Sequence, residues 1–335
     1  MRKIIIILVV INIYHVAYNQ IIKGVVQDQS TKNPINFAAV YFNGTFVGTH
    51  AGQNGNFEID ISKNRSMPLI ISALGYYSAV VSDLSPDKYY RIYLKPKVFE
   101  LNDIVISDKG DARIRRERRT NIKIFREIFI GKTLNAQKCE ILNKNDLLFK
   151  YDSSGDTIKA LSIKPLLIEN KALGYKITYY LDRFEYSEQT DYFYFYGNIM
   201  FLEDSITRVK HAQNIEEKRE IAFLGSRMHF FRTLWGNDLD SSGYSVLDAK
   251  HRKLSYNDLV IQTDSLSKFI KNPGTLTISY NQGTPETYLT LTQDSVGFYK
   301  NGSFNGSGIK WDGNMAVQRI ADQLPYEYSY KKSNR

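Results

Sequence analysis

A compact set of polar side chains lies late in the chain, beside an aromatic stretch. The set consists of Ser226, His229 and Arg232, and a histidine near an arginine is a combination that hydrolytic sites use. The apolar residues around the set repeat at helical spacing, which predicts a helix with a core stripe of Leu224, Met228, Phe231 and Trp235. The polar set lies off that stripe, so it is either part of a site or, as we favour, the capped and solvated side of the helix.

A second candidate is a row of tyrosines in a strand predicted over 191–201. Strand alternation places Tyr192, Tyr194 and Tyr196 on one face, with Phe193 and Phe195 on the other. Tyrosine rings can stack against sugar rings, and they can equally form a barrier whose hydroxyls stay in water. The row is therefore a possible glycan platform or an ordinary amphipathic strand face.

A third candidate is a basic segment at 109–132, which holds nine Lys or Arg against three Asp or Glu, a formal net charge of +6. Ile114, Ile122 and Phe125 fit one stripe of a helix that ends near Gly131. Such a helix can contact anionic headgroups or acidic glycans, or it can simply be a solvated face. The candidate surface is formed by Arg113, Arg115, Arg116, Arg118 and Arg119.

Other chemistries have no support in the sequence. Cys139 is the single cysteine, which excludes an intramolecular disulfide and a thiolate metal cluster, and we interpret it as a buried apolar residue. The histidines form no HExxH motif, and the Gly/Ser-rich stretch at 301–308 matches neither a phosphate-binding loop nor a nucleophile elbow. We expect no metal and no cofactor, and we assign no catalytic residue.

The N-terminus predicts export. Arg2 and Lys3 precede an apolar run of about a dozen residues, shorter than the roughly 20 that a membrane span needs. Residues 1–20 therefore fit a secretory signal peptide. No cysteine stands at the expected cleavage region, so we expect a protein that is not a lipoprotein. An exported protein of the periplasm or outer-membrane surface is not expected to have nucleic acid as a partner.

The 335 residues, 43% of them apolar, are enough for about two domains. Residues 21–96 read as short alternating strands separated by turns such as Asn43-Gly44 and Asn54-Gly55. The successive motifs Ile22–Val26, Pro34–Val40, Gly55–Ile59 and Ile71–Tyr76 resemble the carboxypeptidase regulatory-like domain. That resemblance implies a seven-stranded transthyretin-like β-sandwich that carries no zinc and no peptidase activity.

After a linker at 97–114, residues 115–330 predict a mixed α+β domain, so the whole chain is expected to be mainly β. Apart from the helix at 224–235, a charged helix is predicted over 214–222 and a closing helix over 316–324, ended by Pro325. The predicted strands cover 147–151, 157–163, 175–186, 191–201, 276–280, 288–292 and 296–300.

Three stretches of this second domain, 165–177, 225–232 and 319–325, resemble a recurring group of exported bacterial proteins that join the sandwich to a domain of unknown function. The resemblance implies a location but no activity. It adds Glu169 and Arg227 to His229 and Arg232 as candidates for a pocket or for ligand contact, and the same motifs can equally be packing signatures.

The sequence thus favours a non-catalytic binding or scaffolding protein of the cell envelope, with a protein partner or a glycan as ligand. A hydrolase whose groups assemble only in the fold, from Glu169, Arg227, His229 and Arg232, is one alternative. A membrane-surface adaptor that uses the basic helix is the other. The sequence leaves the oligomeric state open.

Overall fold

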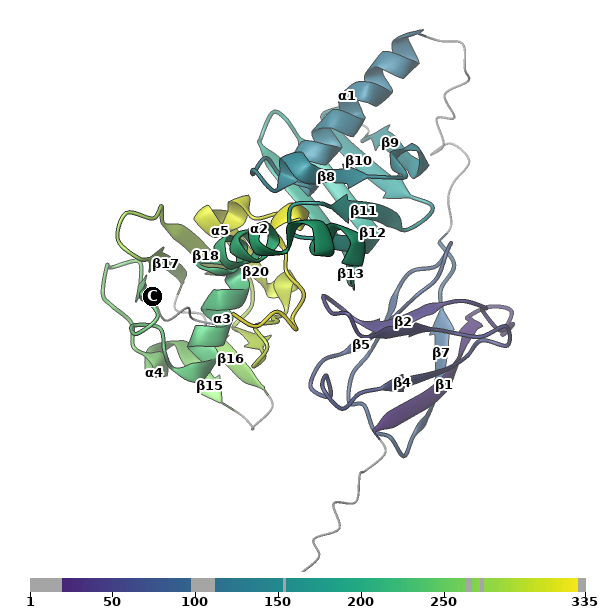
Figure 1. Ribbon diagram of the computed structural model, residues 1–335, viewed down its shortest axis with the longest axis horizontal. Coiled ribbons are helices and arrows are strands. Elements are labelled where there is room, and N and C mark those ends of the chain that lie inside the picture. The colour runs from purple at the N-terminus through teal and green to yellow at the C-terminus, as the bar shows by residue number, and fades with distance from the viewer. Residues whose placement is uncertain (1–19, 98–111, 153–154, 263–266, 272–273, 331–335) are drawn as a thin grey trace, which may run out of the picture.

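The computed structural model describes residues 20–97, 112–152, 155–262, 267–271 and 274–330, arranged as three bodies (Figure 1). The predicted signal peptide, up to residue 19, and most of the predicted linker lie outside the described residues. Strands predominate, and the chain is mainly β as expected, with a β N-terminal domain followed by a mixed region.

The first body is a sandwich of seven strands between residues 20 and 97. One sheet has the order β4-β1-β7 and the other the order β3-β2-β5-β6. Alternating apolar residues such as Phe57 and Ile59 point between the sheets and form the core. The strands are β1 (Ile21–Asp28), β2 (Ala39–Phe42), β3 (Gly48–His50), β4 (Asn56–Asp60), β5 (Leu69–Ser72), β6 (Ala79–Val81) and β7 (Tyr89–Leu94).

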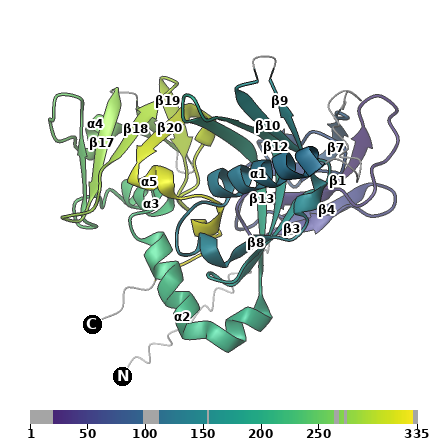
Figure 2. The ribbon, with the colours of Figure 1, turned by 90° about the horizontal axis from the view of Figure 1, so that it is seen from above.

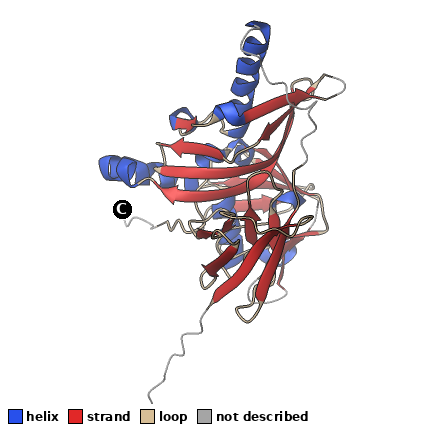
Figure 3. Cartoon of the chain, turned by 90° about the vertical axis from the view of Figure 1, so that its right-hand side faces the viewer, coloured by secondary structure: helices blue, strands red, loops and turns tan. Residues whose placement is uncertain are grey.

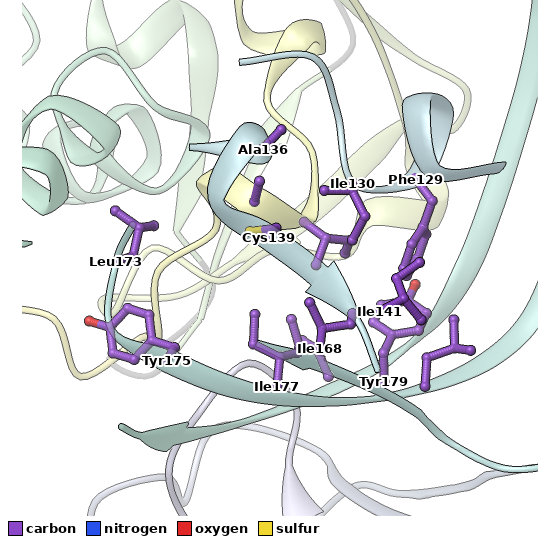
Figure 4. Packing of buried hydrophobic residues seen from close by; sticks show 14 of the residues in the cluster. Phe129, Ile130, Ala136, Cys139, Ile141, Ile168, Leu173, Tyr175, Ile177 and Tyr179 are labelled. Atoms are coloured by element: carbon purple, nitrogen blue, oxygen red, sulfur yellow. The ribbon is translucent and has the colours of Figure 1, made fainter. Parts of the chain in front are cut away.

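The second body is a six-stranded sheet whose longest strands, β12 (Tyr175–Ser187) and β13 (Tyr192–Glu203), run through the middle of Figure 3. Helix α1 (Ala112–Phe129) packs on one face through Phe125 and Phe129, whose rings contact Phe184 and Tyr179. The core continues through the residues drawn in Figure 4. The other strands are β8 (Cys139–Ile141), β9 (Leu147–Tyr151), β10 (Thr157–Ser162) and β11 (Leu166–Asn170).

Helices α2 (Ser205–Phe223) and α3 (Arg227–Gly236) lead to the third body, and α2 extends away from it in Figure 2. Two sheets, β14-β17-β18-β20 and β15-β16-β19, enclose a core of their own with Phe230 and Phe231 of α3. These elements are β14 (Tyr244–Leu247), α4 (Tyr256–Leu259), β15 (Val260–Gln262), β16 (Lys268–Lys271), β17 (Thr275–Tyr280), β18 (Thr287–Leu291), β19 (Ser295–Phe298), β20 (Ile309–Gly313) and α5 (Asn314–Val317).

The prediction of a closing helix over 316–324 is wrong. Helix α5 ends at Val317, Arg319 is extended, and only one short 3-10 turn follows at Ile320–Asp322. Tertiary hydrogen bonds replace the helical ones, because the Ala321 amide donates to the Ile130 carbonyl. The charged helix predicted over 214–222 exists, but α2 begins earlier, where the Asp204 side chain accepts a hydrogen bond from the Thr207 amide.

The sandwich is docked on the six-stranded sheet. Tyr41 on its outer face stacks on Tyr180 of β12 at 5.6 Å between ring centroids. The turn after β2 lies along the edge of β13, where the Gly44 amide donates to Ile199 and the Phe201 amide to Thr45. A Cβ at Gly44, where φ is +76°, would lie 2.5 Å from the Tyr326 ring. Glycine at this turn therefore permits the close approach of the two bodies.

Candidate functional site

The polar set of α3 is engaged in local structure. Ser226 caps the helix by accepting a hydrogen bond from the His229 amide at 3.0 Å. His229 is buried, and its Nδ1 accepts a hydrogen bond from the Gly225 amide at 3.2 Å and lies 3.1 Å from the Tyr244 hydroxyl. Burial, assisted by the charge of Arg232, lowers the pKa of His229 to about 4. The imidazole is therefore held neutral.

The two arginines of α3 also point at backbone carbonyls. Arg227 donates to Met315 and Gln318. Arg232 donates to the carbonyls of Asn301, Tyr326 and Tyr328 at 2.9, 3.0 and 2.7 Å. We call Arg227, His229 and Arg232 the α3 joint: the two arginines tie α3 to the C-terminal segment, and the His229 ring lies in the same helix against Gly225 and Tyr244.

Glu169 is not brought together with the α3 joint. It lies on β11, and its carboxylate pairs with Lys171 at 3.0 Å. Its neighbour Asn170 donates to the Ala321 carbonyl at 2.9 Å, and Arg319 donates to the Ile128 carbonyl. The three motif stretches of the second domain thus meet through the C-terminal segment, and the contacts they make there are packing contacts.

The basic helix is partly committed to the fold. Arg118 donates to the carbonyls of Leu147 and Asn145 at 2.9 and 3.1 Å, which attaches α1 to the start of β9. Arg116 and Arg119 are exposed, as are Arg113 and Arg115. Figure 1 shows the N-terminal part of α1 projecting beyond the sheet.

The tyrosine row faces solvent. Tyr192, Tyr194 and Tyr196 on β13 are 50%, 38% and 44% exposed. On the opposite face, Phe195 packs against Phe129 in the core. The strand pairing places Tyr194 across from Glu185, and Tyr196 across from Arg183. The row therefore shares a sheet face with charged residues of β12.

Those charged residues line a groove of about 220 Å³ between the sheet and the sandwich. A β-bulge in β12 builds it, because the pairing with β13 shifts between Leu181 and Arg183. Leu181 and Phe184 point into the core, and the bulge leaves both Asp182 and Arg183 on the groove side. Bulges re-aim side chains in this way and are frequent beside binding sites. The polar lining consists of Tyr77, Lys97, Lys150, Lys159, Ser162, Asp182, Arg183 and Glu185.

The sandwich also matches a known family. Residues 22–106 match the family model of the CarboxypepD_reg-like domain. The match ends before α1 and leaves the second and third bodies without an assigned family. No curated protein matches the chain.

The CarboxypepD_reg-like domain supplies one wall of the groove. Lys97 at its end binds Asp182 of β12 at 3.2 Å, and its ammonium lies 5.4 Å from the Tyr77 ring centroid. Both partners of the ion pair are largely buried, at 15% and 14% side-chain exposure. Burial raises the pKa of Asp182, and Lys97 partly offsets that rise. The pair thus joins the domain to the sheet at the groove.

Sequence reasoning found the tyrosine row but missed Asp182, Arg183 and Glu185. The available signal was the run Leu181-Asp182-Arg183-Phe184, in which two adjacent charged residues interrupt the alternation of a predicted strand. Such an interruption marks a possible bulge. Lys97 reaches the groove only because the sandwich docks on the sheet, and the sequence around Lys97 contains no pattern that predicts this contact.

The described part of the chain contains no group of three or more His, Cys, Asp or Glu residues arranged to hold a metal ion. Cys139 is buried, and burial together with the nearby Asp322 charge raises the pKa of its thiol to about 12. Its nucleophilic thiolate is therefore disfavoured. No described helix combines the length and apolar character of a membrane span.

Proposed function

We propose that this is an exported, non-catalytic binding protein of the bacterial cell envelope that holds a glycan in the groove and along the tyrosine row. The observation that carries the proposal is the adjacency of the two features on one sheet face. Aromatic rings supply flat apolar surface for sugar rings, and the charged groups beside them supply hydrogen bonds that orient the ligand.

The contacts of the candidate residues favour binding over catalysis. In the α3 joint, the arginines donate to backbone carbonyls, and the His229 ring contacts the Gly225 amide and the Tyr244 hydroxyl. In the groove, Asp182 pairs with Lys97, and Glu185 pairs with Arg183 at 3.0 Å. Both carboxylates are therefore already engaged by a cation within the groove. No contact in the described residues specifically favours a hydrolase or a membrane-surface adaptor.

The CarboxypepD_reg-like domain has a scaffolding role in this proposal. Its outer face is already used within the chain, since Tyr41 packs on Tyr180. Its Tyr77 and Lys97 form one side of the groove. We infer that the domain shapes the binding site rather than serving as a separate adhesive module.

Titration with oligosaccharides tests the glycan-binding function. The full-length protein is titrated calorimetrically with a panel of defined neutral and acidic tetrasaccharides. Replacing Tyr194→Ala should weaken binding about tenfold, which corresponds to about 1.4 kcal/mol. The matched control is Tyr89→Ala, which removes an exposed tyrosine of the sandwich strand β7. Absence of binding to every member of the panel contradicts the function.

Export is tested on the native protein. N-terminal sequencing of the protein recovered from the envelope fraction should begin near residue 20, because the apolar N-terminal run is expected to be removed on secretion. A protein found in the cytoplasm with Met1 or its near neighbours intact contradicts export and leaves the groove without access to envelope glycans.

A further inference from the structure

Glu185 lies between two cations that both retain outward-facing donors. Its carboxylate is 3.0 Å from Arg183 Nη2 and 3.8 Å from Lys159 Nζ. The side-chain exposures are 14% for Glu185, 60% for Arg183 and 38% for Lys159. A guanidinium has five N–H donors and an ammonium three, so one covered carboxylate leaves several donors pointing toward solvent.

The arginine is positioned by an aromatic ring and a carboxylate. The Arg183 guanidinium carbon lies 5.3 Å from the centroid of the Tyr194 ring, and its Nη2 donates to Glu185 at 3.0 Å. A guanidinium held by a ring and a carboxylate loses less conformational freedom when it binds a further partner. The row from Tyr192 to Tyr196 spans about 14 Å at the strand rise of ~3.4 Å per residue, which gives space for more than one sugar ring.

The groove has an excess of positive charge. Four cationic side chains line it, Lys97, Lys150, Lys159 and Arg183, together with two carboxylates, Asp182 and Glu185. This excess of positive charge attracts an anionic ligand.

We propose that the groove selects saccharides that carry carboxylates, such as oligosaccharides of uronic acids. The ligand's carboxylate accepts hydrogen bonds from the outward N–H groups of Arg183 and Lys159, while its sugar rings lie along Tyr194 and Tyr196. This inference rests on the proposed glycan-binding function and adds the charge of the ligand. Planar carboxylates suit the guanidinium fork, whereas a neutral sugar leaves these donors to water.

The experiment compares acidic and neutral probes of equal length. Tetramers of galacturonate, glucuronate and mannuronate are titrated into the full-length protein beside cellotetraose and the methyl ester of tetragalacturonate. At least one uronate tetramer should bind more than tenfold tighter than the neutral probes, and the difference should shrink as salt is added. Inorganic phosphate is a separate arm that measures binding of an anion without sugar rings.

Substitution separates the charge from the rings. Arg183→Gln should weaken uronate binding about 10- to 100-fold, the loss expected for a hydrogen bond to a charged group, and should leave neutral saccharides unaffected. Arg91→Gln makes the same charge change at an exposed site of the sandwich strand β7 and should have no effect. Arg183 is largely exposed, so its replacement is compatible with folding.

The outcomes distinguish the two proposals. If neutral and acidic probes bind equally and only Tyr194→Ala weakens them, the glycan-binding function stands and carboxylate selection is overturned. Phosphate binding as tight as uronate binding overturns it too, because the groove is then a general anion site. If no saccharide binds, both proposals fail.

Discussion

Arg232 of α3 and Arg183 of β12 both lie over aromatic rings, with the guanidinium carbon 5.3 Å from the ring centroid in each case. Their hydrogen-bond partners differ. Arg232 donates to three backbone carbonyls, whereas Arg183 donates to the carboxylate of Glu185 and remains 60% exposed. The N–H donors of Arg232 are therefore engaged by backbone carbonyls, whereas Arg183 is held by Glu185 and keeps N–H donors that face solvent.

The comparison shows that residue type alone does not mark a binding site. The α3 joint looked like a candidate site because a histidine and two arginines lie close together in sequence. His229 is buried, and the two partly buried arginines donate to backbone carbonyls, so the joint stabilises the packing around α3. In the groove, Arg183 pairs with Glu185 and is 60% exposed, and such an exposed ion pair contributes little stability, about 0–1 kcal/mol. The fold therefore depends on Arg183 far less than on Arg232.

The largest expected difference between the two arginines is in stability. Arg232→Met keeps the aliphatic stem and removes the donors to Asn301, Tyr326 and Tyr328. Leaving these three partly buried carbonyls without their donors should lower the free energy of unfolding by about 3 kcal/mol. Arg183→Met should lower it by less than about 0.5 kcal/mol, because its ion pair is exposed. Urea titration of both variants measures the difference.

Tryptophan fluorescence is a suitable signal for this titration. The two tryptophans of the chain, Trp235 of α3 and Trp311 of β20, pack against the third-body core. Binding of saccharides should be unchanged in Arg232→Met at a urea-free, folded condition. Equal destabilisation by the two substitutions would remove the distinction between joint and groove.

The α3 joint should also give the third body an acid-sensitive stability. The folded pKa of His229, about 4, lies below the usual 6.5, so the unfolded chain binds protons more readily. Stability from this group is present above pH 6.5 and is lost as the pH falls toward 4. Between pH 7 and 5 the loss should be about 2 kcal/mol. The rings facing His229 are those of Phe223, Tyr244 and Tyr280, and the nearby charge is Arg232.

The measurement is the pH dependence of the unfolding free energy in three proteins. His229→Gln should lose about 2 kcal/mol less than the wild type between pH 7 and 5. His50→Gln, at an exposed position of β3, should follow the wild type. Parallel curves for His229→Gln and wild type would show that the imidazole is not held neutral.

The sequence predicted the elements that build the groove better than the groove itself. The strand predicted over 147–151 has the same bounds as β9, and the one predicted over 175–186 differs from β12 by one residue. Alternation of apolar residues is local, so it can be read from one segment. The bulge left one local sign, the adjacent charged residues Asp182 and Arg183, whereas the contact of Lys97 with Asp182 depends on the docking of another segment, which no local pattern encodes. The extended conformation of Arg319 has the same origin.

An intermediate effect is expected for the ion pair that joins the groove to the sandwich. Lys97 and Asp182 are both largely buried, so each supports the other. Lys97→Met and Asp182→Asn should each destabilise the docking of the sandwich, and the double variant should lose less than the sum. The coupling energy should be about 1–2 kcal/mol. Hydrogen exchange of the Gly44 and Phe201 amides, which form the docking bonds, reports it. If the destabilisation in the double variant equals the sum of the two single effects, the Lys97–Asp182 pair does not stabilise the docking of the sandwich.

The smallest expected effect is the stability change of Arg183→Gln. It tests most directly whether Arg183, unlike Arg232, is dispensable for folding. The substitution breaks an exposed ion pair with Glu185 and should change the free energy of unfolding by less than about 0.5 kcal/mol. A cation kept for folding would cost more when removed, as Arg232 should. Thermal unfolding of Arg183→Gln beside Arg91→Gln, with the same change of net charge, measures this. A loss as large as that of Arg232→Met would mean that the bulge exists to hold the sheet together, and the excess of positive charge in the groove would then need no ligand.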